Sequence, residues 1–408
     1  MNNRKRYVVL AALCVQAFCI GGIYAWSVFA VPLSEIRNWD YGLVTLAYSM
    51  YLLINSLMAI PSGWMIKHVP VKKIMICSSF MFGLGWLATG FAGNIPLLFI
   101  CMGLCCGAGA GLRYNPAITT AVYWFPDKPG FASGLVLGCM GIAPLILAPV
   151  SNMLLARFNV LSAFRITGFF FFAASLLAAL LTKGPEMAGA DKESASLEDV
   201  FSENDYTWNR MMKTGRFYVL WVVFLGSCIS GLMMIGHASA IGQEIAGITA
   251  GQAAMLVGIL AVANFSGRLI IGALSDKIGS IRSLLICLII NITDMLLLSQ
   301  ANGFLLFTAA IVVTGIAFGG IMAVYPSLIS ETFGASNLGL NYGIIFTAYG
   351  IAAIVGPMAV TMFRQSTGSY LLSFVFAGVC TALSLILTIG FALTRRKTKA
   401  GAPLPTKS

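Results

Sequence analysis

The sequence predicts an all-α integral membrane protein with twelve transmembrane helices in two groups of six. Its 408 residues are 59% hydrophobic and 10% charged, whereas soluble domains have about 25% charged residues. The mean hydropathy is +0.89. A helix needs about 20 apolar residues to cross a bilayer, and stretches of that length follow one another along the chain. The two groups also repeat each other in sequence.

Short polar breaks separate the predicted spans. The first group lies at about 7–31, 41–66, 72–92, 96–124, 130–156 and 161–182. The second group lies at about 217–240, 249–275, 282–301, 303–332, 338–363 and 370–394. These positions divide the chain into an N-terminal bundle (1–182), a cytoplasmic linker (183–216), a C-terminal bundle (217–394) and a cytoplasmic tail (395–408). Part of the linker, 197–212, has apolar residues at helical spacing; it either lies on the membrane surface or forms a solvated tether.

The net charge of +11 is explained by membrane topology, and we expect no nucleic-acid partner. With the N-terminus inside the cell, nineteen of the 25 lysines and arginines fall in cytoplasmic segments, four in outer loops and two within spans. This distribution follows the positive-inside rule. We therefore expect a monomeric multi-pass protein of the cell (inner) membrane, embedded in the lipid bilayer, with both termini in the cytoplasm.

The internal repeat is visible in matched landmarks. The stretch GWMIKHVPVKK (63–73) corresponds to GALSDKIGSIR (272–282) at an offset of 209 residues, and Gly141 corresponds to Gly350 at the same offset. Pro116 and Pro326 are 210 residues apart. Duplicated six-helix units with a binding site between them, near the bilayer midplane, are typical of secondary transporters.

The stretch GALSDKIGSIR resembles the cytoplasmic loop signature of the major facilitator superfamily, which implies the major facilitator fold of two pseudo-symmetric six-helix bundles. In this stretch, which begins at Gly272, Asp276 can accept hydrogen bonds from a neighbouring helix N-terminus and from Arg282. Such contacts would latch the cytoplasmic ends of the helices. The first copy has Lys67 in place of the aspartate and Pro70 in place of a glycine, so we expect a weaker latch there.

Four further stretches resemble the oxalate/formate antiporter family, a relative of the monocarboxylate transporters: GGIYAWSVFAVP, AVYWFPDKPGFASG, NFSGRLIIGALSDKIG and YPSLISETFG. The resemblance implies transport of small organic anions by alternating access, with mono- or dicarboxylates such as formate, lactate, pyruvate or oxalate as substrates. Anion exchange and proton symport are both open. In this family an arginine of the eighth helix binds the carboxylate, and Arg268 stands at that place.

Two arginines, Arg113 and Arg268, lie within predicted spans, where a charge costs about 2.5–3.5 kcal/mol. The acids within or bordering the spans are Asp294 and Glu331. An excess of guanidinium groups favours a carboxylate ligand, which accepts two parallel charge-assisted hydrogen bonds. Three roles are open for Arg113: it clamps a dicarboxylate together with Arg268, it gates, or it supports helix packing.

The chain departs from its relatives at two positions. Oxalate-exchanging members have a lysine in the eleventh helix where this chain has Tyr349. Related proton-coupled transporters have an aspartate one turn before the arginine, where this chain has Asn264, so proton coupling through that pair is unsupported. His237, in the seventh span, is the candidate proton site.

The remaining candidates for the binding pocket are polar and aromatic side chains within the spans: Tyr24, Tyr114, Asn115, Tyr325 and Tyr349. We expect no enzyme, no cofactor and no metal site, because the cysteines of the spans lack metal-ligand spacing and the chain has no phosphate-binding Gly-x-x-x-x-Gly-Lys-Ser/Thr motif. Two alternative functions are export of larger amphipathic compounds and a transport-silent carboxylate sensor.

Overall fold

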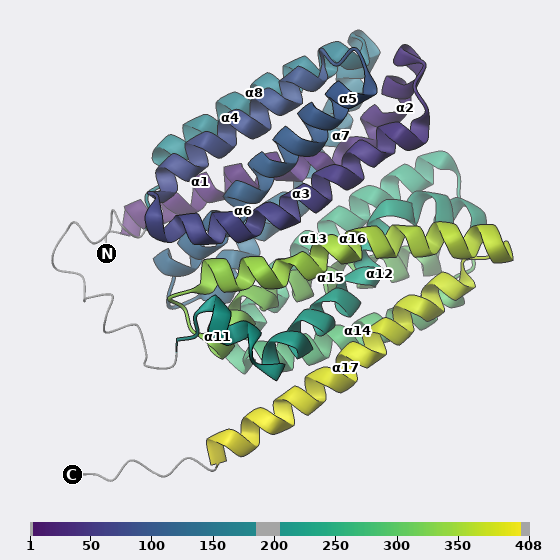
Figure 1. Ribbon diagram of the computed structural model, residues 1–408. Coiled ribbons are helices and arrows are strands. Elements are labelled where there is room, and N and C mark those ends of the chain that lie inside the picture. The colour runs from purple at the N-terminus through teal and green to yellow at the C-terminus, as the bar shows by residue number, and fades with distance from the viewer. Residues whose placement is uncertain (1–2, 185–204, 401–408) are drawn as a thin grey trace, which may run out of the picture.

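The computed structural model describes residues 3–184 and 205–400. This part of the chain is helical and contains twelve helices long and apolar enough to cross a membrane, which confirms the predicted fold class. Figure 1 shows two bundles side by side, one formed by α1 to α8 and one by α12 to α17. Residues 185–204 and 401–408, which include much of the predicted linker and tail, lie outside the described residues.

The N-terminal bundle contains ten helical segments. They are α1 (Asn3–Gly21), a 3-10 segment η1 (Gly22–Ala25), α2 (Trp26–Arg37), α3 (Tyr41–His68), α4 (Val71–Thr89), α5 (Ile95–Leu98), a π-helical segment η2 (Phe99–Cys106), α6 (Gly107–Trp124), α7 (Pro129–Arg157) and α8 (Val160–Leu181). The α5, η2 and α6 segments together form the predicted fourth span.

The C-terminal bundle begins after a short linker helix. The linker helix is α11 (Trp208–Met212), and the bundle consists of α12 (Gly215–Ile245), α13 (Ala250–Ile278), α14 (Ser280–Ser299), α15 (Phe304–Phe333), α16 (Leu338–Thr367) and α17 (Leu371–Ala400). A capping box between Thr249 and Gln252 starts α13, because it satisfies backbone N–H groups that have no partner within the helix. Gly279, with φ of 89°, allows the sharp turn into α14.

The first span is interrupted at Gly21 and Gly22, where α1 passes into the 3-10 segment η1. A Cβ atom at Gly21 would lie 2.1 Å from the carbonyl oxygen of Met140 on α7. That oxygen has no i+4 amide partner within α7, because residue 144 is a proline and has no N–H. The close packing of α1 on this kinked part of α7 therefore needs a glycine, and it places Tyr24 of η1 between the two bundles.

The two bundles touch closely at the end of the molecule where α1 begins and α17 ends, which we call the terminal end (left in Figure 1). Gly63 on α3 packs against Gly339 on α16, and Gly130 on α7 packs against Gly272 on α13. A Cβ atom added to Gly63 would lie 2.3 Å from the backbone oxygen of Gly339, and one added to Gly272 would lie 2.6 Å from the backbone oxygen of Gly130. Gly63 and Gly272 are 209 residues apart, and so are Gly130 and Gly339. The two contacts are therefore related by the internal repeat.

Asp276 reinforces one of these two contacts. Its carboxylate oxygens accept hydrogen bonds from the backbone N–H groups of Gly130, at 2.8 Å, and Phe131, at 3.0 Å. The carboxylate therefore caps the N-terminus of α7, as the loop signature predicts. The predicted contact with Arg282 is not formed, because this arginine is exposed and the ion pairs of the described residues do not include it.

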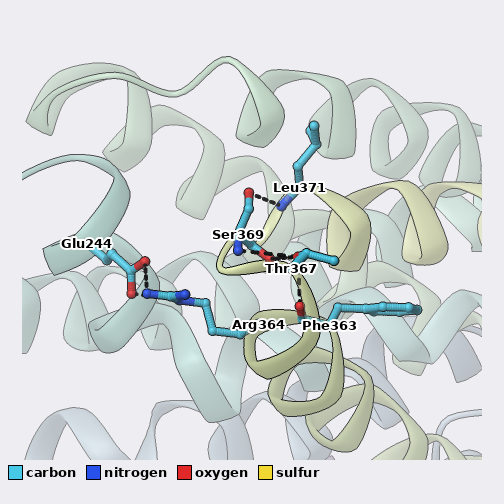
Figure 2. A network of polar contacts seen from close by, with 6 residues as sticks. All are labelled: Glu244, Phe363, Arg364, Thr367, Ser369 and Leu371. Atoms are coloured by element: carbon cyan, nitrogen blue, oxygen red, sulfur yellow. Dashed lines mark hydrogen bonds and ion pairs between the residues drawn. The ribbon is translucent and has the colours of Figure 1, made fainter.

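The opposite end of the molecule has a polar network inside the C-terminal bundle (Figure 2). Arg364 at the end of α16 forms a two-point ion pair with Glu244 on α12, with nitrogen–oxygen distances of 2.6 and 3.1 Å. Thr367 and Ser369 order the following turn into α17. These contacts hold α12 and α16 to each other and do not connect the two bundles.

We expect Gly272→Val to open the terminal end, because the new side chain must displace the backbone at Gly130. Distances between spin labels at Lys73 and Arg282, which are exposed on opposite bundles at this end, should increase in the variant. Gly390→Val on α17 is the matched control, since a Cβ atom there meets no atom within 4 Å. An unchanged distance distribution in Gly272→Val would contradict this account of closure.

Candidate functional site

A cavity lies between the two bundles at about mid-length of the helices. Its lining consists of Tyr24, Gly141 and Pro144 from the N-terminal bundle and Ile235, Val257, Leu260, Ala261, Asn264 and Arg268 from the C-terminal bundle. Three of these residues, Tyr24, Pro144 and Val257, also line a larger hollow of about 800 Å³. The larger hollow extends along α7 and α13 away from the terminal end. The two bundles are therefore in close contact at the terminal end and leave a hollow between them toward the opposite end.

Arg268 is the charged residue of the cavity lining. It is 1% exposed, and its Nη1 atom donates a hydrogen bond to the backbone oxygen of Leu137 on α7. Its Nε atom is buried and has no hydrogen-bond partner. The ion pairs of the described residues join Arg6 with Asp127, Arg364 with Glu244 and Arg395 with Glu331. Arg268 thus carries a positive charge into an apolar cavity without a carboxylate partner among these residues.

Of the α13 residues that line the cavity, the sequence predicted Arg268 as a candidate binding residue. Val257, Ala261, Asn264 and Arg268 follow one another at intervals of three or four residues, and Leu260 is next to Ala261; this is the spacing of one helix face. Counting back from Arg268 by helical turns is a signal in the sequence that identifies this whole face. Asn264 is buried, and its Oδ1 atom has no hydrogen-bond partner.

Tyr24 and Tyr349 meet across the two bundles beside the cavity. Their hydroxyl oxygens lie 3.1 Å apart, and the Tyr349 ring stacks on Phe346 with 4.8 Å between ring centroids. Tyr24 lines the cavity, whereas Tyr349 contributes through its contact with Tyr24. The position that holds a lysine in oxalate-exchanging relatives is here occupied by a neutral hydroxyl that already has a partner.

Three other predicted pocket residues are packed outside the cavity lining. Tyr114 stacks on Phe346 with 4.4 Å between centroids. Asn115 donates hydrogen bonds to the backbone oxygens of Ala59 and Gly339. Tyr325 donates to the backbone oxygen of Leu220 and stacks on Phe224. Tyr114 and Asn115 contact the opposite bundle and help to close the molecule, so this conformation does not bring these three side chains to the cavity.

Arg113 lies inside the N-terminal bundle and is not among the residues that line either cavity. Its Nε donates to Ser78 Oγ at 2.6 Å, its Nη2 to the Ser78 backbone oxygen at 2.9 Å, and its Nη1 to Gln16 Oε1 at 3.0 Å. The guanidinium carbon lies 4.7 Å from the centroid of the Phe82 ring. Neutral acceptors and an aromatic face surround this charge. This conformation therefore does not place Arg113 in the cavity lining with Arg268, and of the three roles left open for Arg113 its contacts favour the support of helix packing.

Two other titratable groups within the spans, Asp294 and His237, also lie outside the lining of the cavity that contains Arg268. Asp294 on α14 is fully buried and accepts a hydrogen bond from the hydroxyl of Thr314 on α15. His237 on α12 has a buried Nδ1 atom without a partner and does not belong to either cavity lining. Among the described residues, no group of three His, Cys, Asp or Glu side chains could hold a metal ion.

We expect Arg113→Gln to destabilise the protein, because the substitution breaks three buried hydrogen bonds. The loss should be about 3 kcal/mol or more, seen as a melting temperature several degrees lower for the purified protein in detergent. A melting temperature unchanged from that of the wild-type protein would contradict a structural role for Arg113.

The sequence is similar to known membrane transporters over most of its length. It is 32% identical to the uncharacterized MFS-type transporter YhjX of Escherichia coli, over 86% of this chain and 87% of that protein. It is 28% identical to the oxalate:formate antiporter of Oxalobacter formigenes, over 87% and 84% of the two chains. It is 24% identical to monocarboxylate transporter 12 of Rattus norvegicus, over 96% and 85%.

The fold is similar to that of a solved transporter. The structure of FucP in the outward conformation matches with a TM-score of 0.69 at 19% identity and covers 94% of this chain and 99% of that one. The family model described as Major Facilitator Superfamily matches residues 12–301 and 223–408. The chain therefore belongs to the Major Facilitator Superfamily and is a secondary transporter, not an enzyme.

Proposed function

We propose that this transporter moves small monocarboxylate anions and that Arg268 binds their carboxylate group. The observation that carries the proposal is the buried Arg268 guanidinium, which faces the cavity and has no carboxylate partner among the described residues. A charge in an apolar environment needs a counter-ion or strong hydrogen bonds. A substrate carboxylate supplies both, because it can accept two parallel hydrogen bonds from a guanidinium.

The cavity favours a single negative charge. Of the two arginines within the spans, Arg268 lines the cavity, whereas Arg113 is held by Ser78 and Gln16. Tyr349 is neutral and is bonded to Tyr24. The second carboxylate of a dianion such as oxalate would therefore lie in a cavity whose lining holds no second cation. Two relatives are named for carboxylate transport, the oxalate:formate antiporter and monocarboxylate transporter 12, which supports this substrate class.

Alternating access follows from the two ends of the molecule. The terminal end is closed by the glycine contacts and by Asp276. The larger hollow, which shares three lining residues with the cavity at Arg268, extends toward the other end. We place the terminal end in the cytoplasm on the distribution of lysines and arginines, so this conformation faces outward. Anion exchange and proton symport are both compatible with one binding site that faces the two sides in turn.

We expect Arg268→Gln to abolish carboxylate uptake in proteoliposomes. Loss of a buried charged partner costs about 2 kcal/mol or more, so uptake should fall at least about thirtyfold. Uptake by the Arg268→Lys variant should also fall strongly, because an ammonium group cannot make the two parallel hydrogen bonds. Radiolabelled acetate uptake and formate counterflow are the measurements.

Arg157→Gln is the matched control, because Arg157 is exposed at the end of α7. This substitution should leave uptake unchanged. Gel filtration and the melting temperature should show that both Arg268 variants fold. Undiminished uptake by a folded Arg268→Gln protein would rule out the proposed carboxylate site.

A further inference from the structure

We propose that the end of the linker, residues 205–212, is part of the clamp that holds the terminal end closed. In this clamp Asp205 of the linker supplies the acidic group that the first copy of the loop signature lacks, and Lys67 of the N-terminal bundle pairs with it. The inference concerns the movement of the two bundles, so it does not depend on which anion is transported.

The linker end is fixed to the C-terminal bundle at the turn between α15 and α16. The backbone N–H of Tyr206 donates a hydrogen bond to the backbone oxygen of Phe333 at 2.8 Å. The side-chain amide of Asn341, which is fully buried, donates to the backbone oxygen of Tyr206 at 2.9 Å. The Tyr206 and Phe333 rings also meet edge to face, with 5.7 Å between their centroids. The linker end should therefore move together with α15 and α16.

The Asp205 carboxylate lies beside the turn that leads into α16. Gly334 in this turn has a φ of 87°, and a Cβ atom added to it would lie 1.5 Å from Asp205 Oδ1. The other carboxylate oxygen, Oδ2, is buried and has no hydrogen-bond partner among the described residues. Asn337, the residue before α16, makes no capping hydrogen bond with its side chain. A negative charge near a helix N-terminus is stabilised by the helix dipole, so this position suits a carboxylate.

Lys67 reaches the same turn from the opposite bundle. It stands at the end of α3, and its ammonium group donates a hydrogen bond to Asn337 Oδ1. The ammonium group also interacts electrostatically with the Asp205 carboxylate. Because α3 belongs to the N-terminal bundle whereas Asp205 and Asn337 are held by the C-terminal bundle, both contacts must be lost when the bundles separate at this end.

The internal repeat explains why an acid from the linker is needed. In the second copy of the loop signature, Asp276 on α13 accepts hydrogen bonds from the first N–H groups of α7. The repeat places position 67 on α3 opposite the start of α16 in the same way, but the residue there is a lysine. A lysine cannot cap a helix N-terminus, because its charge has the same sign as that end of the helix dipole. Asp205 brings the missing negative charge to α16, and Lys67 connects it to the other bundle.

Removing either charge should open the terminal end. In Asp205→Asn and in Lys67→Gln, the fraction of molecules with this end open should rise about two- to fivefold, the range expected for a charged contact at a protein surface. Pulsed EPR distances between spin labels at Lys73 and Arg282, measured in lipid nanodiscs without substrate, report this fraction. Lys213→Gln is the matched control, because Lys213 is an exposed lysine that follows the linker helix. Distance distributions that stay unchanged in both variants would overturn the proposal.

A reversed charge at position 67 tests the pairing itself. In Lys67→Asp two carboxylates face each other, so the terminal end should open. Adding Asp205→Asn to this variant should close the end again, because the new aspartate can then cap α16 as Asp276 caps α7. The same change at position 205 is thus expected to open the wild-type protein and to close the Lys67→Asp variant. An effect of Asp205→Asn in the same direction in both proteins would overturn the pairing of Lys67 with Asp205.

Discussion

A buried guanidinium group between two helical bundles, without a carboxylate partner in the described part of the chain, is the feature on which the other interpretations of this transporter depend. The chain contains two intramembrane arginines, and their surroundings separate their roles. Arg113 donates three hydrogen bonds to Ser78 and Gln16 and stacks on Phe82, so its donors are used within the protein. Arg268 has one backbone acceptor and an unpartnered Nε at the cavity. Of the two charges, it is the one that a substrate can complete.

The duplication of the sequence gives the scaffold around this charge its symmetry. The contact of Gly63 with Gly339 and that of Gly272 with Gly130 are repeat-related, and each allows two helix backbones from opposite bundles to approach closely. The polar contacts that reinforce these two glycine contacts differ. Asp276 caps α7, whereas the corresponding position in the first copy of the repeat is Lys67. Lys67 instead donates to Asn337 at the start of α16. Closure at one end thus combines a shared packing rule with two different polar contacts.

The sequence predicted the twelve spans, because hydropathy reports directly on the length of chain that must cross a bilayer. Most of their ends were predicted to within a few residues, but the first span ends at Ala25 and not near residue 31. The sequence did not predict the interruption at Gly21 and Gly22, which depends on the carbonyl of Met140 on another helix. The sequence also left three roles open for Arg113, because its partners Ser78 and Gln16 are distant from it in sequence. Asn264, in contrast, could have been added to the site by helical spacing from Arg268.

The most direct measurement is an experimental structure of the transporter with a bound monocarboxylate such as glycolate. The account predicts carboxylate oxygens within hydrogen-bond distance of the Arg268 guanidinium, while Arg113 keeps its bonds to Ser78 and Gln16. A ligand bound elsewhere, or an Arg113 side chain turned away from Ser78 to share the anion, would contradict it.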